Sequence, residues 1–165
     1  MRVFTLGTDH RHQFDFARIL LKYGVEVVFD VRRTPESQEP HFRRDGLQAL
    51  CAGQGIDYVY LGNELGGPRE GDWQGWTGTE EYTRGLGIIR KKAEKRVCCV
   101  LCAERTPDYC HRLTIAADIV KAGIEVVHLL DETTIWQAPP RRPAPPPSRP
   151  AGRPMHRGRP GRGRR

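Results

Sequence analysis

The feature that most limits the fold of this chain is a series of short apolar runs that alternate with helix-like segments. The apolar runs, which are predicted strands, lie at residues 2–6, 25–30, 58–61, 97–102 and 125–130. The predicted helices between them lie at residues 13–23, 42–52, 80–94 and 108–122. Strands that are apolar throughout are buried on both faces, and alternation with helices favours parallel pairing. We therefore predict an α/β fold, a single domain with a mainly parallel five-stranded sheet covered by helices.

The end of the chain differs from the rest in composition. Residues 138–165 hold nine arginines, nine of the 13 prolines and no acidic residue, although the whole chain has a net charge of only +7. Such a segment buries too little apolar surface to offset the entropy lost on ordering it. We predict an α/β domain at residues 1–137, with a net charge of −2, and a disordered Arg/Pro/Gly-rich tail at residues 138–165.

The tail contains Arg157-Gly158-Arg159-Pro160, which matches the core of an AT-hook. In that motif arginines, here Arg157 and Arg159 with Arg162 nearby, lie along the narrow minor groove of A·T-rich DNA. Two alternatives stay open: a general affinity for DNA or RNA, and a solubilising tail that binds no nucleic acid. Binding of either kind should depend steeply on salt, because the arginines neutralise phosphates.

Membrane and secreted proteins are disfavoured. No apolar run approaches the roughly 20 residues that span a bilayer, and the first residues do not form a signal peptide. The five cysteines are an odd number without secretory context, which favours free thiols in a reducing compartment. We predict a cytoplasmic protein without a membrane partner.

Reactive side chains gather where the predicted strands end, which is where open parallel sheets bind ligands. Gly7 follows the first strand, and Asp30 and Arg32 follow the second. The densest group follows the fourth strand and consists of Cys102, Glu104, Cys110, His111 and Arg112. These residues form the candidate site.

Within the candidate site, four residues are predicted to be catalytic. The start of a helix favours anions and lowers the pKa of a thiol. Cys102 or Cys110 is therefore the predicted nucleophile, with Glu104 or His111 as acid or base. A second enzymatic hypothesis makes Glu104 the nucleophile or acid in glycosyl chemistry on a nucleoside.

Four further residues are predicted to bind the substrate, with Arg32 and Arg112 as anion clamps beside Asp30 and Gly7. The expected substrate is an anionic or nucleotide-like small molecule, because two arginines and a helix start converge on it. The simpler interpretation of Asp30 is that it caps or positions a loop, and the simpler interpretation of His111 is that it donates a hydrogen bond to a neighbouring carbonyl.

The cysteines also fit roles other than catalysis. Cys102 and Cys110 form a redox pair in one alternative, and with His111 they hold zinc in another. We predict no metal or cofactor, because the second closely spaced Cys/His pair of a structural zinc site is absent from the sequence. Cys99 and Cys102 formally give C-x-x-C, but residues three apart on a strand point to opposite faces.

A Gly-rich stretch at residues 62–78 carries Trp73 and Trp76, and Tyr82 follows it. These aromatic side chains either stack on a planar ligand or pack the stretch onto the domain. Long loops in compact domains are often functional.

Several short motifs resemble the DUF488 family. They are Thr5-Leu6-Gly7, Asp30-Val31-Arg32, Pro40-His41-Phe42, Leu65-Gly66-Gly67 and, most specifically, Cys102-Ala103-Glu104 with Cys110-His111-Arg112. The resemblance spans about residues 3–130 and implies a small α/β protein of the bacterial or archaeal cytoplasm. It implies no reaction, because the family is named for its unknown function. One departure is the turn Gly7-Thr8-Asp9-His10, where members often have a Gly-His-Ser-like turn.

Three classes of function follow from these patterns. An enzyme-like domain with a Cys/Glu/His/Arg site accounts for the largest number of singled-out residues. The alternatives are a non-catalytic DNA- or RNA-binding accessory protein that acts through its tail, and a metal or redox sensor.

Overall fold

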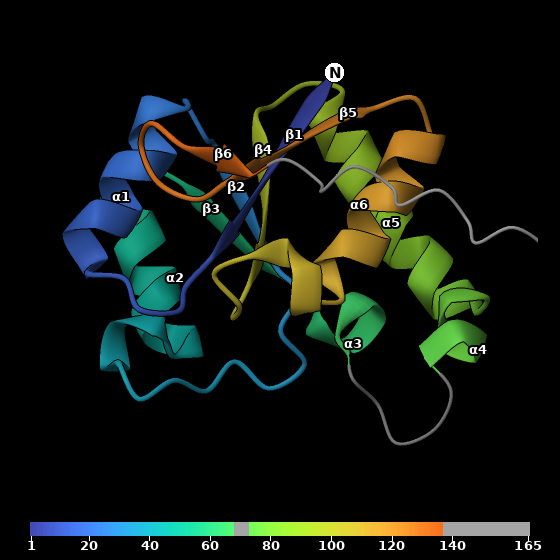
Figure 1. The fold of residues 1–165 in the computed structure, drawn as a ribbon, viewed down its shortest axis with the longest axis horizontal. Helices are drawn as coiled ribbons and strands as arrows, with labels where there is room; N and C mark the ends of the chain where they lie inside the picture. The colour runs from blue at the N-terminus through green and yellow to red at the C-terminus, as the bar shows by residue number, and fades with distance from the viewer. Residues whose placement is uncertain (68–72, 137–165) are drawn as a thin grey trace, which may run out of the picture.

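The computed structural model describes residues 1–67 and 73–136, which form a six-stranded sheet with helices on both faces (Figure 1). The strands are β1 (Arg2–Gly7), β2 (Val27–Asp30), β3 (Asp57–Tyr60), β4 (Cys98–Cys102), β5 (Glu125–Leu129) and β6 (Ile135–Trp136). Their order in the sheet is β3-β2-β4-β1-β5-β6. The first five strands pair in parallel, as predicted. The additional strand β6 pairs antiparallel with β5, and its two residues are too few to form a sequence pattern.

Helices cover both faces of the sheet. They are α1 (Gln13–Lys22), α2 (Arg44–Gly53), α3 (Gly62–Leu65), α4 (Trp73–Thr77), α5 (Glu80–Ala93) and α6 (Arg112–Lys121), with short 3-10 helices η1 (Pro40–Phe42) and η2 (Pro107–Tyr109). Helices α1 and α2 pack on one face, and α3, α5 and α6 pack on the other (Figure 1). Alternate strand residues supply the two layers, so that Cys99 faces α1 and α2 while Cys102 lies on the α5 and α6 face.

Three predicted segments differ in detail from the structure. The predicted helix at 42–52 starts at Arg44, after the separate helix η1. The predicted helix at 108–122 starts at Arg112, because Cys110 has extended backbone angles (φ −122°, ψ 137°) that separate it from η2. Part of the Gly-rich stretch at 62–78 is helical, since α3 and α4 lie within it.

The order of the strands creates a crevice at the carboxyl end of β4. This strand lies between β2 and β1. The chain leaves β1 and β2 toward α1 and α2 on one face, but it leaves β4 toward α6 on the other face. Segments that leave neighbouring strands toward opposite faces separate there, and such switch points are where α/β sheets bind ligands.

No helix in the described parts of the chain combines the length and the apolarity needed to cross a membrane. The predicted disordered tail at 138–165, with Arg157, Arg159 and Arg162, lies outside the described residues.

Candidate functional site

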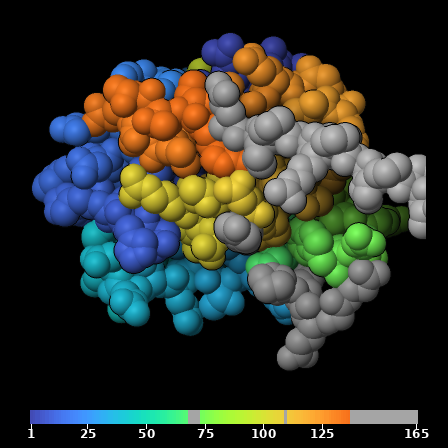
Figure 2. Space-filling model, viewed as in Figure 1, coloured from blue at the N-terminus to red at the C-terminus, as the bar shows by residue number. Residues whose placement is uncertain are grey.

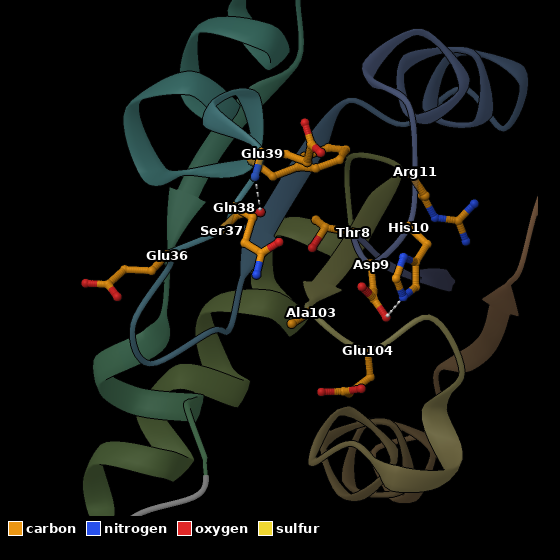
Figure 3. Close-up of a pocket in the computed structure, with 11 residues that line it drawn as sticks. Thr8, Asp9, His10, Arg11, Glu36, Ser37, Gln38, Glu39, Ala103 and Glu104 are labelled. Atoms are coloured by element: carbon orange, nitrogen blue, oxygen red, sulfur yellow. Dashed lines mark hydrogen bonds and ion pairs between the residues drawn. The ribbon is translucent and has the colours of Figure 1, made fainter.

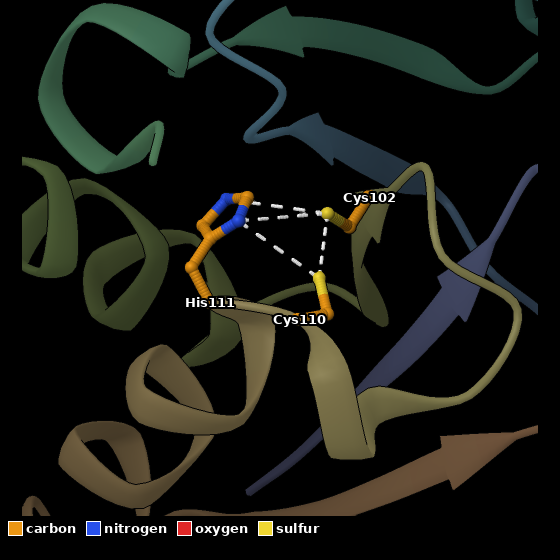
Figure 4. Close-up of side chains that lie close together, drawn as sticks. All are labelled: Cys102, Cys110 and His111. Atoms are coloured by element: carbon orange, nitrogen blue, oxygen red, sulfur yellow. Dashed lines mark hydrogen bonds between the residues drawn. The ribbon is translucent and has the colours of Figure 1, made fainter. Parts of the chain in front are cut away.

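Three of the four predicted catalytic side chains meet at the carboxyl end of β4 (Figure 4). Cys102 is the last residue of β4, Cys110 lies between η2 and α6, and His111 is the N-cap of α6. The two sulfur atoms are 2.7 Å apart, and both cysteines are free thiols. His111 Nδ1 lies 3.8 Å from the sulfur of Cys102 and 3.9 Å from that of Cys110. Residues up to nine positions apart in the sequence thus bring two thiols and an imidazole into contact.

His111 donates a hydrogen bond to a neighbouring backbone carbonyl, as the simpler interpretation of this residue expected. Its Nε2 lies 3.0 Å from the carbonyl oxygen of Val31, which directly follows β2. A carbonyl only accepts hydrogen bonds, so Nε2 carries a proton and donates it. Nδ1 is then the ring atom that can exchange a proton with the sulfurs, which suits a general base.

The surroundings of the sulfur pair favour a thiolate on Cys110. Its sulfur accepts a hydrogen bond from the backbone N–H of Arg112 at 3.4 Å, and it faces His111 and the Cys102 thiol. These contacts lower the pKa of Cys110 well below its usual range, with the hydrogen bond from Cys102 as the largest cause. The pKa of Cys102 is raised by the same hydrogen bond and by burial. We therefore assign the proton shared by the sulfurs to Cys102.

The other three cysteines lie in the core. Cys51, Cys98 and Cys99 are buried, and burial raises the pKa of each thiol. A buried thiol with a raised pKa is unreactive at neutral pH. Cys102 is also buried with a raised pKa, and what separates it from these three is the contact of its sulfur with Cys110 and His111.

The sulfurs lie closer together than those of a zinc-bound site. Cys102, Cys110 and His111 offer three ligand atoms within 4.8 Å of one another. Tetrahedral zinc with Zn–S bonds of about 2.3 Å holds two sulfurs roughly 3.8 Å apart. At 2.7 Å the sulfurs are too close for such a site, and they would have to separate by about 1 Å to accept the metal.

Arg112, a predicted anion clamp, is directed into the protein. Its side chain is 1% exposed and donates to the carbonyl oxygens of Glu104 and Arg105 at 3.0 and 3.3 Å. Nε and Nη1 have no hydrogen-bond partner among the described residues. The guanidinium therefore fixes the turn that follows β4, and its backbone N–H, not its side chain, contacts the reactive sulfur.

Arg32, the second predicted clamp, is paired inside the protein with Asp30. Two parallel hydrogen bonds of 2.9 and 2.7 Å join its guanidinium to the carboxylate, and Nη1 donates to the carbonyl oxygen of Phe42 at 2.7 Å. The hydroxyl of Tyr58 donates to the same carboxylate at 2.8 Å. Asp30 and Arg32 are 0% and 4% exposed, so this network orders the segment that follows β2.

Gly7 and Glu104 meet through the backbone. A Cβ atom on Gly7 would lie 1.9 Å from the carbonyl oxygen of Glu104, so glycine is needed for the close approach of the two segments. The carboxylate of Glu104 is exposed and points toward the hollow beside Asp9 and His10 (Figure 3). Gly7 thus has a packing role, and Glu104 lies at the edge of the cysteine site.

The sulfur pair opens onto a cleft. Its volume is about 1070 Å³, and its wall includes Arg33, Trp73, Cys102, Cys110 and His111. The segment that follows β4 crosses the middle of this side of the molecule, in yellow in Figure 2. The cleft is the crevice that the strand order creates.

Trp73 was singled out in the sequence as a candidate for stacking on a ligand. Its ring packs edge-on against His111, at 5.7 Å between centroids, and against Tyr82, at 6.0 Å. Trp76 donates from Nε1 to the carbonyl oxygen of Glu64, and Tyr82 donates to Asp118. The three aromatic side chains thus pack against the domain, and Trp73 also lines the cleft.

A family model described as a domain of unknown function, DUF488, matches residues 14–119. The chain belongs to the DUF488 family. The match includes the Cys-Ala-Glu and Cys-His-Arg motifs that form the site, as the sequence resemblance implied. No curated protein and no solved structure matches the chain. The DUF488 assignment supports the fold and supplies no reaction, so the function is argued from the site alone.

Proposed function

We propose that this DUF488 protein is a thiol–disulfide oxidoreductase in which Cys110 is the attacking thiolate and Cys102 the resolving thiol. The observation that carries the proposal is the 2.7 Å contact between the two free sulfurs. A disulfide bond is about 2.05 Å long, so bond formation needs only a small further approach. A hydrolase or transferase nucleophile does not need a second thiol at this distance.

Cys110 is the better attacking residue for two independent reasons. Both cysteines line the cleft, but Cys110 is 8% exposed and Cys102 only 3%. Cys110 also receives the backbone N–H at the start of α6, and its pKa is lowered. A low pKa increases the thiolate fraction and makes the same sulfur a good leaving group in the second exchange.

The exchange balances with His111 as the proton carrier. The Cys110 thiolate attacks a substrate disulfide R–S–S–R, forms a mixed disulfide and expels R–S⁻, which takes a proton from solvent. His111 then accepts the proton of Cys102, whose thiolate attacks the sulfur of Cys110 and expels the second R–S⁻. This second R–S⁻ takes the proton that His111 accepted from Cys102. Two electrons pass to the substrate, and the protein is left with a Cys102–Cys110 disulfide that a dithiol reduces.

A titration of the reduced full-length protein with 4,4′-dithiodipyridine tests this proposal. We expect rapid release of two equivalents of thiopyridone and a Cys102–Cys110 disulfide in the peptide mass map. Cys102→Ser should release one equivalent and retain the mixed disulfide on Cys110, while Cys110→Ser should lose the rapid phase. Cys51→Ser alters a core cysteine, and its release of thiopyridone should match that of the unmodified protein.

Two outcomes would contradict the proposal. In one, the folded protein releases a single equivalent and keeps a stable mixed disulfide on Cys110. In the other, neither sulfur reacts until the protein unfolds. Circular dichroism of each variant shows whether a lost phase reflects a lost thiol or a lost fold. Glu104→Gln should keep the full reaction, whereas its inactivation would favour a role for that carboxylate in proton transfer.

A further inference from the structure

The reactive sulfurs lie at the floor of a cleft and not on an open surface. Their residues are 3% and 8% exposed, and the cleft above them has a volume of about 1070 Å³. Clefts of roughly 300–1,000 Å³ are typical of small-molecule sites. A disulfide in a folded protein would have to enter together with its flanking backbone, whereas a small disulfide can enter alone.

Among the described residues that line the cleft, the charged side chains are mainly acidic. Glu36, Glu104 and Asp108 line it, and the two arginines of its wall are Arg32 and Arg33. Asp30 neutralises Arg32, so among the described lining residues Arg33 is the guanidinium that this buried pair does not hold. A thiolate on the floor adds negative charge. The cleft therefore attracts cations, because a charge-lined cleft focuses its field on the ligand.

A second hollow continues the cleft away from the sulfurs. It has a volume of about 480 Å³ and shares Glu36, Ala103 and Glu104 with the main cleft. Figure 3 shows Glu104 near Asp9, and both residues line this hollow. A substrate bound at the sulfurs thus has room to extend past Ala103 between two glutamates.

We infer that the substrates of the sulfur pair are low-molecular-weight disulfides that carry amino groups, and not disulfides of folded proteins. The inference rests on the proposed function and adds the substrate class to it. Depth of the sulfurs sets the size limit, and the acidic lining of the cleft sets the preferred charge.

Three small disulfides of similar length test the charge preference. Cystamine is cationic, bis(2-hydroxyethyl) disulfide is neutral and 3,3′-dithiodipropionate is anionic at neutral pH. The rate of protein oxidation by each is divided by the rate with free 2-mercaptoethanol, which corrects for the intrinsic reactivity of the probe. At low salt we expect the corrected rate to be roughly tenfold higher for cystamine than for the anionic probe. The difference should shrink in high salt.

Variants of a cleft-lining residue test whether the preference for cationic disulfides arises in the cleft. Glu36→Gln removes one lining carboxylate and should lower the corrected ratio of cystamine to dithiodipropionate. Glu94→Gln is the matched control, because Glu94 is the exposed C-cap of α5 and does not line the cleft. The size limit is tested with insulin, whose disulfides should oxidise the protein more slowly than cystamine at equal disulfide concentration.

The inference is overturned if the anionic probe reacts as fast as cystamine after correction, or if insulin reacts as fast as cystamine. Either result would leave the dithiol exchange itself intact. If none of the four disulfides oxidises Cys102 and Cys110, the proposed function fails first. The two proposals are therefore separately falsifiable.

Discussion

Asp30 is a fully buried carboxylate that two side chains share. Arg32 binds it through two parallel hydrogen bonds, and Tyr58 binds it through a third side chain–side chain bond of 2.8 Å. Burying two charges costs free energy, which their mutual attraction and hydrogen bonds offset. The balance depends on all partners, because removing one leaves the other charged group without compensation in the core.

Replacing Asp30 should therefore destabilise the protein strongly. Asp30→Asn leaves the buried guanidinium of Arg32 uncompensated, and we expect the free energy of unfolding to fall by about 3–5 kcal/mol. Tyr58→Phe removes one hydrogen bond to the pair and should cost about 1–2 kcal/mol. Urea unfolding of the three proteins measures both effects. A smaller loss for Asp30→Asn than for Tyr58→Phe would contradict this account.

His128 makes the stability depend on pH. Burial, followed by the charge of Arg112, lowers its pKa from 6.5 to about 4. Between these values the unfolded chain binds a proton that the folded protein does not, so stability falls as the pH drops from 6.5 to 4. We expect His128→Gln to flatten this part of the profile by about 2 kcal/mol in urea unfolding at several pH values. An unchanged slope in the variant would show that other groups cause it.

At the scale of elements, the end of β1 and the turn after β4 determine the shape of the site. Gly7 lets the backbone of Glu104 and Arg105 approach, and Arg112 holds the carbonyls of the same turn. This turn connects the two reactive cysteines. Its position therefore controls the distance between their sulfurs.

Gly7→Ala should displace that turn. The new Cβ would meet the carbonyl oxygen of Glu104 at 1.9 Å, and backbone cannot move aside as a side chain can. We expect a loss of about 1–3 kcal/mol in stability and a slower second exchange step at Cys102. Gly53→Ala is the control, because nothing lies within 4 Å of its added Cβ at the end of α2. Equal stabilities of the two variants would refute the packing role of Gly7.

The sequence was sufficient for the five parallel strands, the long helices and the grouping of the reactive residues, but not for β6. Strand ends at one edge of a parallel sheet are close in space, which brought Cys102, Cys110 and His111 together correctly. The partners of Arg32 and Arg112 were not predictable. The position of an arginine in the sequence does not say whether its side chain points into the protein or into the cleft. The carbonyl of Val31, which orients His111, is a backbone group and has no sequence signal.

At the scale of the whole molecule, the charge divides into two parts with different expected roles. Residues 1–137 have a net charge of −2 and contain the sulfur pair, whereas nine arginines lie in residues 138–165. The strands of the sheet and the sulfur pair all lie within the described residues up to 136. Disulfide exchange and nucleic-acid binding should therefore be separable by truncation.

Deleting residues 138–165 should abolish retention on duplex DNA at low salt and leave the release of thiopyridone unchanged. In the full-length protein, the logarithm of the DNA affinity should fall steeply with the logarithm of salt concentration, because several phosphates are neutralised. Replacing Arg157, Arg159 and Arg162 by alanine tests the AT-hook hypothesis against a control in which Arg141, Arg142 and Arg149 are replaced. If the segment is an AT-hook, only the first variant should lose the preference for A·T-rich over G·C-rich duplexes. If the tail binds nucleic acid without specificity, both variants should bind DNA equally weakly. Undiminished DNA binding by residues 1–137 would place the interface on the domain and refute the role of the tail.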